Sequence, residues 1–327
     1  MRHHPLIATA VTAGLLATAC GDAGSGGGSG SGGGPTIAVA TTVLGDVVAH
    51  LVGEEATVDV VMPANADPHE FQPSARQAVA LREADLVVTN GAGFEAGLDD
   101  TVDAAEEDGT PVFVAVDHVD TLVAGEDGDD HADEEAGGAG EDGDDHGDGD
   151  VDPHFFTDPL RMADAAEALS EELAAEVPGL DTAAFRERAA AYVAELRALD
   201  GEVREIVAPI PDDRRRLVTN HLGFTYFADR YGFEVVGAVI PSASTAAAPS
   251  AGELDDLAAA ITAEGVPAVF TDASSSARLA DTLAGEAGDV AVVELFSESL
   301  GDPGTGADSY VGMMRTNATR IADALAP

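Results

Sequence analysis

Residues 183–208 read AAFRERAAAYVAELRALDGEVREIVA, and this stretch decides how the fold is organised. It follows Asp181, which can cap a helix, and it contains no proline. A helix of about 27 residues is about 40 Å long at 1.5 Å per residue. Because a helix of that length can join two lobes, we predict an N-terminal lobe over 36–180, a linking helix over 181–209 and a C-terminal lobe over 210–327.

The regions on both sides of this helix alternate short apolar runs with helical patterns, which is typical of βαβ units and parallel sheets. Before the long helix we expect strands at 36–40, 58–62, 85–90 and 111–117, and helices at 44–52, 73–83, 94–107 and 159–177. After it we expect strands at 216–219, 234–240, 268–271 and 290–295, and helices at 224–231, 251–264, 277–286 and 310–326. The sequence therefore predicts an α/β fold of two parallel-sheet lobes joined by one long helix. Ligands of such folds bind beyond the carboxyl ends of the strands, so we expect a site in the cleft between the lobes.

The charge of the chain excludes several kinds of partner. Its 327 residues include 61 Asp and Glu against 15 cationic residues, all of them Arg, and the formal net charge is −46. Nucleic-acid binding needs clustered basic residues, so no nucleic-acid partner is expected. Electrostatic docking on anionic lipid is disfavoured for the same reason. A hydrophobic content of 45% nevertheless indicates a folded protein.

The N-terminus has the pattern of an export signal. Leu6–Leu16 is an apolar run that is too short to span a bilayer but typical of a signal peptide. Small residues then precede Cys20, the only cysteine, as in a lipobox. We therefore predict a signal peptide at 1–19, lipidation of Cys20 and a Gly/Ser tether at 20–35, although cleavage by a soluble signal peptidase stays an alternative. The protein is expected outside the cytoplasm, held by its lipid on the outer face of the cell membrane.

Histidine and carboxylate side chains follow several of the predicted strands. The tripeptide Asp-Pro-His occurs at 67–69 and again at 152–154, and the strands at 216–219 and 290–295 run into His221 and Glu298. Three imidazoles and one carboxylate make a four-coordinate site that suits Zn²⁺. The distances between these residues in the sequence are long, so their spacing alone does not distinguish a metal site from unrelated loop histidines.

The local motifs are more specific, because they resemble those of a known family. The sequences ADPHEFQPS (66–74), DPHFFTDP (152–159), TNHLGFTYF (219–227), LFSESL (295–300) and DSYVGMMRTN (308–317) resemble the metal-binding class of ABC-transporter solute-binding proteins, the zinc and manganese receptors. The resemblance implies two lobes bridged by one rigid helix. It places the metal ligands at His69, His154, His221 and Glu298.

The resemblance also bears on which metal is bound. Relatives that take manganese usually carry a carboxylate where His221 stands, so His221 indicates the zinc branch. Glu298 departs from the family pattern because aspartate is usual there, and the extra methylene could alter metal preference. Gln72 is a second departure, since glutamate is common at that position.

We therefore expect an extracytoplasmic high-affinity receptor that carries Zn²⁺ as cargo to an ABC permease and its ATPase subunit. We expect the receptor to be a monomer and to catalyse no reaction. A manganese receptor of the same family is the alternative for the metal. A zinc hydrolase, for which Glu70 is the candidate base, and a surface adhesin or metal buffer without a transporter are alternatives for the function.

An acidic segment precedes the second predicted ligand. Residues 125–150 hold 13 acidic residues, eight Gly and two His, and they contain no apolar side chain larger than Ala. Such a segment cannot form a core and predicts a mobile surface loop. It could collect metal weakly through its carboxylates, His131 and His146, or it could be a solvated insertion, and both interpretations stay open.

Overall fold

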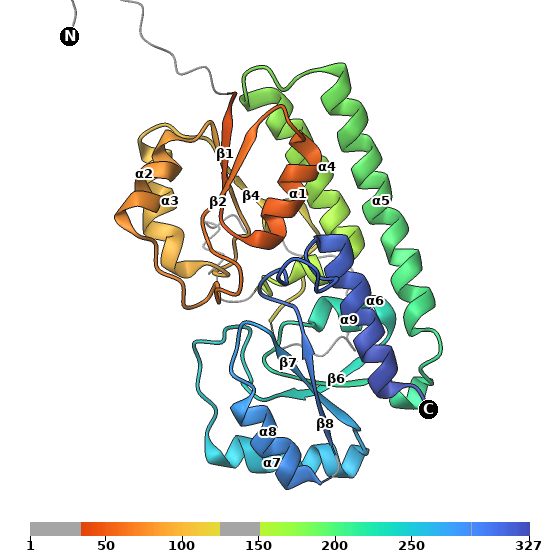
Figure 1. Cartoon of the computed structure of the whole chain (residues 1–327). Helices are drawn as coiled ribbons and strands as arrows, with labels where there is room; N and C mark the ends of the chain where they lie inside the picture. The colour runs from red at the N-terminus through yellow and green to blue at the C-terminus, as the bar shows by residue number, and fades with distance from the viewer. Residues whose placement is uncertain (1–33, 125–150, 289) are drawn as a thin grey trace, which may run out of the picture. The chain divides into compact units, whose positions relative to one another are not determined.

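The computed structural model describes residues 34–124, 151–288 and 290–327 of the chain (Figure 1). The predicted signal peptide, Cys20 and nearly all of the tether lie outside these residues. The acidic segment with His131 and His146 also lies outside them. None of the helices in the described ranges is long and apolar enough to cross a membrane.

The architecture consists of two four-stranded sheets, each entirely parallel. The first sheet has the order β2-β1-β3-β4, and the second has the equivalent order β6-β5-β7-β8. The strands are β1 (Thr36–Val39), β2 (Thr57–Val60), β3 (Leu86–Thr89), β4 (Val112–Val114), β5 (Arg216–Thr219), β6 (Glu234–Ala238), β7 (Ala268–Asp272) and β8 (Ala291–Leu295). The predicted α/β class with two parallel-sheet lobes is confirmed.

Helices cover both faces of each sheet, because alternate side chains of a strand point to opposite faces. Ile37 and Val39 of β1 belong to the large central core, whereas Ala38 packs in a smaller core on the other face. The helices are α1 (Thr42–Val52), α2 (Ala75–Glu83), α3 (Asp99–Glu107), α4 (Pro159–Glu176), α5 (Ala183–Val207), α6 (Thr225–Tyr231), α7 (Ala251–Glu264), α8 (Arg278–Ala287) and α9 (Tyr310–Leu325). Helices α2 and α3 lie against the first sheet, and α7 and α8 lie against the second (Figure 1).

The predicted long helix is α5, and it runs alongside both lobes (Figure 1). It packs on α1 and α4 of the first lobe and on α9 of the second. Thr182 caps it by accepting a hydrogen bond from the backbone N–H of Phe185. The expectation that Asp181 is the cap is therefore wrong.

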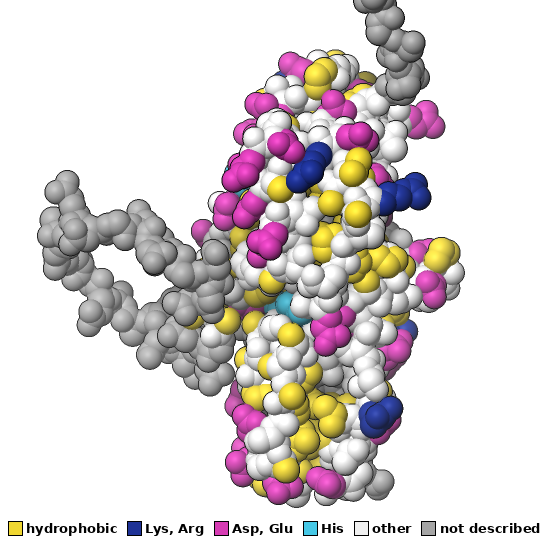
Figure 2. All heavy atoms as spheres, turned by 90° about the vertical axis from the view of Figure 1, so that its left-hand side faces the viewer, with side chains coloured by type: hydrophobic (Ala, Val, Ile, Leu, Met, Phe, Trp, Pro, Cys, Tyr) yellow, Lys and Arg dark blue, Asp and Glu magenta, His cyan; other side chains and the backbone are white. Residues whose placement is uncertain are grey.

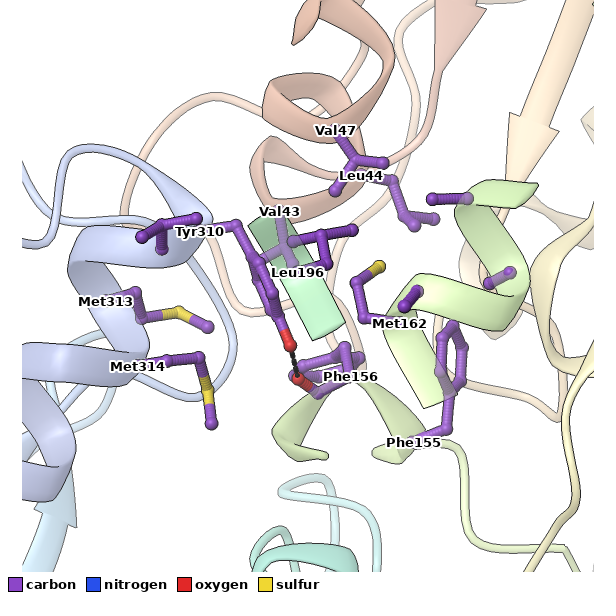
Figure 3. Close-up of a cluster of buried hydrophobic side chains, with 14 of the residues drawn as sticks. Val43, Leu44, Val47, Phe155, Phe156, Met162, Leu196, Tyr310, Met313 and Met314 are labelled. Carbon is purple, nitrogen blue, oxygen red and sulfur yellow. Dashed lines mark hydrogen bonds between the residues drawn. The ribbon is translucent and has the colours of Figure 1, made fainter. Parts of the chain in front are cut away.

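The central core connects the two lobes (Figure 3). The hydroxyl of Tyr310, at the start of α9, donates a 2.7 Å hydrogen bond to the carbonyl of Phe156, just before α4. Met313 and Met314 pack on the same side of this bond in Figure 3, and all four residues are buried. This packing anchors the segment that follows His154.

Two predicted helix starts differ from the structure. The expected helix at 94–107 begins only at Asp99, after a 3₁₀ turn over Ala96–Leu98. The reason is that the carboxyl group of Glu95 accepts a hydrogen bond from the backbone N–H of Asn90, which holds the chain in a turn. Helix α8 begins at Arg278, one residue later than expected, and the backbone N–H of Arg278 donates a 3.4 Å hydrogen bond to the hydroxyl of Ser276.

Acidic side chains are spread over the exposed surface rather than gathered on one lobe. Figure 2 shows one face on which Asp and Glu far outnumber Arg and lie above and below its middle. The excess of acid is therefore a general property of the surface in this view, and it does not mark a binding site by itself.

Candidate metal centre

His69 lies in the loop that follows β2. Its backbone N–H donates a 3.0 Å hydrogen bond to Oδ1 of Asp67, which fixes the turn that carries the ring. The edge of Phe94 packs against the ring with centroids 5.1 Å apart. Both ring nitrogens are buried, and neither forms a hydrogen bond in the described part of the chain; Nε2 has an ion-pair contact of 3.3 Å with Oε2 of Glu298. An imidazole with two unsatisfied buried nitrogens is suited to bind a ligand.

His154 is fully buried just before α4, and Asp152 orients it. Nδ1 of His154 lies 2.7 Å from Oδ1 of Asp152, and the same oxygen accepts the backbone N–H of His154. Tyr226 donates a 2.7 Å hydrogen bond to the carbonyl of Asp152 and accepts one from the N–H of Leu122. A carboxylate on Nδ1 leaves Nε2 free for a metal, which is the usual arrangement around ligating histidines.

His221 is the second residue after β5, in the loop where the sequence predicts it. Its Nε2 lies 3.1 Å from Nε2 of His154 and 3.0 Å from Oε1 of Glu298. The hydroxyl of Thr219, the last residue of β5, donates a 2.7 Å hydrogen bond to the carbonyl of His221. The end of the strand therefore determines where this ring lies.

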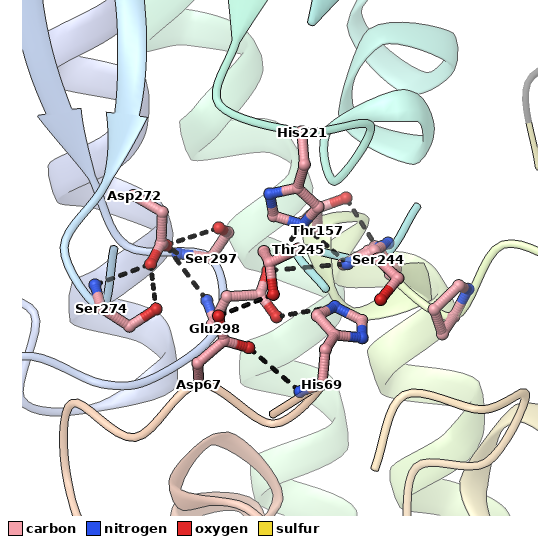
Figure 4. A network of polar contacts seen from close by, with 12 residues as sticks. Asp67, His69, Thr157, His221, Ser244, Thr245, Asp272, Ser274, Ser297 and Glu298 are labelled. Atoms are coloured by element: carbon pink, nitrogen blue, oxygen red, sulfur yellow. Dashed lines mark hydrogen bonds and ion pairs between the residues drawn. The ribbon is translucent and has the colours of Figure 1, made fainter. Parts of the chain in front are cut away.

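Glu298 follows β8, and Asp272 at the end of β7 positions it. Oδ2 of Asp272 accepts hydrogen bonds from the backbone N–H groups of Ser297 and Glu298, at 2.9 and 3.3 Å. The other oxygen accepts the N–H and the hydroxyl of Ser274. Figure 4 shows the Glu298 carboxylate between His221 and His69. Oε2 of Glu298 lies 3.3 Å from Nε2 of His69, so the two oxygens face different imidazoles.

The four predicted ligands therefore meet at one point. The ligand atoms of His69, His154, His221 and Glu298 all lie within 4.8 Å of one another. Two ligands of a tetrahedral zinc ion with bonds of 2.0–2.1 Å are about 3.3 Å apart. The separations of 3.0 to 3.5 Å between Glu298 and the three imidazoles are close to that value. The site is small enough for one divalent ion.

Burial and neighbouring charges shift the pKa values of two groups of the site, His154 and Glu298. Burial opposes a charge on His154, but the neighbouring Asp152 carboxylate raises the pKa of His154 to about 10. Burial also opposes a charge on Glu298, yet the surrounding imidazoles hold the pKa of its carboxyl well below its usual range. A metal ion that binds here takes the place of the proton on His154.

A cavity of about 390 Å³ leads to this centre. Residues of both lobes line it together with His69, and they include Gly93, Pro153, Leu222, Ser242 and Ser244. Ala124 and Val151, which flank the acidic segment, also line it. The cavity gives a cation a route to His69 between the lobes.

Two other histidines, His50 and His118, are not part of this cluster. His50 stacks on Tyr192, and His118 stacks on Phe113. Asp158 caps α4 by accepting the N–H of Leu160. Sequence reasoning missed Asp272, although its place at the end of a predicted strand could have identified it.

The chain is similar to known proteins that are named for binding metals. The family described as zinc-uptake complex component A, periplasmic (ZnuA), matches residues 37–324. The zinc-binding protein TroA of Treponema pallidum is 30% identical over 297 residues, which are 89% of each chain. The manganese-binding lipoprotein MntA of Halalkalibacterium halodurans is 25% identical over 311 residues, which are 95% of each chain. The solved structure of periplasmic TroA superposes with a TM-score of 0.77 at 29% identity, covering 90% of this chain and 100% of that one.

Proposed function

This chain belongs to the family of the periplasmic zinc-uptake component A, and from that premise we propose that it is an extracytoplasmic receptor that captures Zn²⁺ and delivers it to an ABC permease. The observation that carries this proposal is the convergence of His69, His154, His221 and Glu298 within 4.8 Å. These side chains come from four separate segments and are almost completely buried. We propose them as the metal ligands.

The donor set supports zinc over manganese. Three imidazoles and one carboxylate suit Zn²⁺, whereas Mn²⁺ prefers sites richer in oxygen. A given nitrogen-containing site also binds Zn²⁺ more tightly than Mn²⁺. Because relatives are named for both metals, the choice between them is a proposal.

The geometry supports capture of the ion rather than catalysis. Four protein ligands leave no coordination position that the protein keeps open, and a catalytic zinc needs one for water. Glu70, the candidate base of a hydrolase, is exposed, whereas Glu298 is buried. We therefore propose that the bound ion is cargo and that the protein carries out no reaction on it.

Titration of the metal-free domain, residues 34–327, with Zn²⁺ tests the proposed ligands. We expect one ion per chain. We expect His69→Ala or Glu298→Ala to lower the zinc affinity by more than about a hundredfold, which is a larger loss than mutation of residues that only contact the ligands causes. His118→Ala is the matched control, because this exposed ring stacks on Phe113 and does not belong to the cluster of four ligands. Unchanged zinc affinity in the ligand variants would refute the site.

Delivery to a transporter is tested in cells. Cells that carry Glu298→Ala should grow poorly when zinc is depleted, and added zinc should restore their growth. Cells that carry His118→Ala should grow normally. Equal growth of both strains would favour the metal buffer or the adhesin, which bind the ion without passing it on.

We also propose that residues 1–19 are removed and that Cys20 then carries the lipid anchor. Residues 20–35 would be the tether to the lobes at 36–180 and 210–327. The name of one relative, a manganese-binding lipoprotein, supports this. Cys20→Ser should abolish labelling with radioactive fatty acid and release the protein from the membrane fraction. Labelling that persists in this variant would refute the anchor.

A further inference from the structure

Gly223, two residues after His221, lies unusually close to the imidazole of that residue. Its backbone N–H donates a 2.8 Å hydrogen bond to the carbonyl of His221, which closes a tight turn. A Cβ atom at position 223 would lie 2.7 Å from Nε2 of His221 and 3.0 Å from Cε1. Both distances are well below a normal van der Waals separation. The ring of His221 therefore occupies space that any side chain at 223 would need.

The backbone does not require glycine at this position. The φ angle of Gly223 lies outside the left-handed region, in contrast with Gly232 nearby, whose φ is 69°. An alanine would meet no backbone strain at position 223, because only glycine gains from a positive φ. The requirement for glycine comes from the imidazole alone.

The same ring nitrogen also contacts two other side chains of the site, Glu298 and His154. Oε1 of Glu298 lies 3.0 Å from Nε2 of His221, and Nε2 of His154 lies 3.1 Å from it. The Cβ at 223 would also lie 3.4 Å from Cδ2 of His154. A shift of the His221 ring to avoid a new methyl group would disturb these contacts, and Figure 4 shows Glu298 below the His221 ring.

We propose that Gly223 is a positioning residue for His221, and that glycine is needed there because residue 298 is glutamate. The glutamate side chain is one methylene longer than aspartate, and the absence of a side chain at 223 makes room for the His221 ring beside it. This inference rests on the proposed metal site and adds a determinant of its geometry. With Glu298, only glycine at 223 leaves the ligand atom of His221 in place. With the shorter Asp at 298, the ring can shift and alanine is tolerated.

The test is a double-mutant cycle on the Zn²⁺ affinity of the chain. Gly223→Ala alone should weaken binding by about tenfold or more, as changes next to a ligand do. Glu298→Asp alone should have a smaller effect. The double variant should bind Zn²⁺ about as tightly as Glu298→Asp alone, so the two changes should be strongly non-additive. Additive losses, or a Gly223→Ala variant with unchanged affinity, would overturn the proposal.

Cobalt absorption separates ligand geometry from stability. Co²⁺ bound to Gly223→Ala should lose the intense visible bands of a four-coordinate site, and the double variant should regain them. Gly201→Ala is the control, because a Cβ at this exposed position of α5 meets nothing within 4 Å, and its spectrum should match that of the parent chain. If Gly223→Ala does not fold, the double variant should fold and bind, and its failure to do so would also overturn the proposal.

The two proposals fail in different ways. If the parent chain binds neither Zn²⁺ nor Co²⁺, the proposed function is refuted, and so is the proposed dependence of Gly223 on Glu298 (the matched pair). A parent chain that binds Zn²⁺ equally well with Gly or Ala at 223 refutes only the matched pair.

Discussion

The hydroxyl of Thr245 donates a 2.6 Å hydrogen bond to Oδ2 of Asp67, a residue 178 positions earlier in the chain. The other oxygen of the same carboxylate accepts the backbone N–H of His69. Thr245 follows β6 in the second lobe, whereas Asp67 follows β2 in the first. One carboxylate thus connects the His69 loop to the opposite lobe.

Removal of this hydroxyl should loosen the hold on a bound ion. Thr245→Val preserves the shape of the side chain but leaves Oδ2 of Asp67 without its donor. A hydrogen bond to a charged group contributes about 1.5–3 kcal/mol, so the zinc dissociation rate should rise about tenfold or more. Stopped-flow release to a chelator measures it. Thr262→Val on α7 is the control, because its hydroxyl bonds only to backbone carbonyls. Equal release rates in both variants would mean that the contact does not retain the ion.

Asp152→Asn should weaken Zn²⁺ binding by about 10–100-fold. The asparagine retains an acceptor for Nδ1 of His154 but loses the charge that makes this imidazole a better donor to the metal. Calorimetric titration with Zn²⁺ measures the change. Asp117→Asn removes the same charge from the exposed surface and should leave the affinity as it is. A loss of similar size in both variants would show that the overall charge, and not this pair, is responsible.

Glu95 should make the stability of the chain depend on pH. Burial raises the pKa of Glu95 to about 8, and Oε2 has no partner among the described residues. The folded state therefore retains a proton that the unfolded state releases near pH 4.5. Stability falls as pH rises from there to about 8, and between pH 6 and 8 this group removes about 2 kcal/mol.

Glu95→Gln should abolish this part of the pH dependence. The free energy of unfolding of the variant, measured with urea in the presence of a chelator, should fall less than that of the parent between pH 6 and 8. Glu83→Gln, at an exposed residue of α2, should follow the parent. Parallel pH profiles of parent and Glu95→Gln would show that Glu95 is already ionised at pH 6.

Local patterns were sufficient to predict most of the fold. Short apolar runs identified the strands, and β5 and α7 have the predicted bounds. The predicted start of α3 was wrong because the carboxyl group of Glu95 accepts a hydrogen bond from the backbone of Asn90, and the spacing of apolar residues does not reveal such a bond. Helix caps were also ambiguous, since Asp181 and Thr182 are both capable and only the geometry selects Thr182.

The site was predictable for a different reason. Strand ends and the repeated Asp-Pro-His indicated candidate ligands, and the resemblance of the local motifs to a known family placed the ligands at His69, His154, His221 and Glu298. The structure brings these four side chains together. Thr245 and Gly223 could not be found in this way. Their roles depend on contacts with residues from other segments, and neither residue type is unusual in a loop.

The central claim is that these four side chains select zinc, and competition between two metals tests it most directly. The metal-free domain is equilibrated with Zn²⁺ and Mn²⁺ together, and the bound metal is determined by mass spectrometry. We expect one Zn²⁺ per chain even when Mn²⁺ is in excess by on the order of a hundredfold. Predominant loading with Mn²⁺ under these conditions would contradict the assignment.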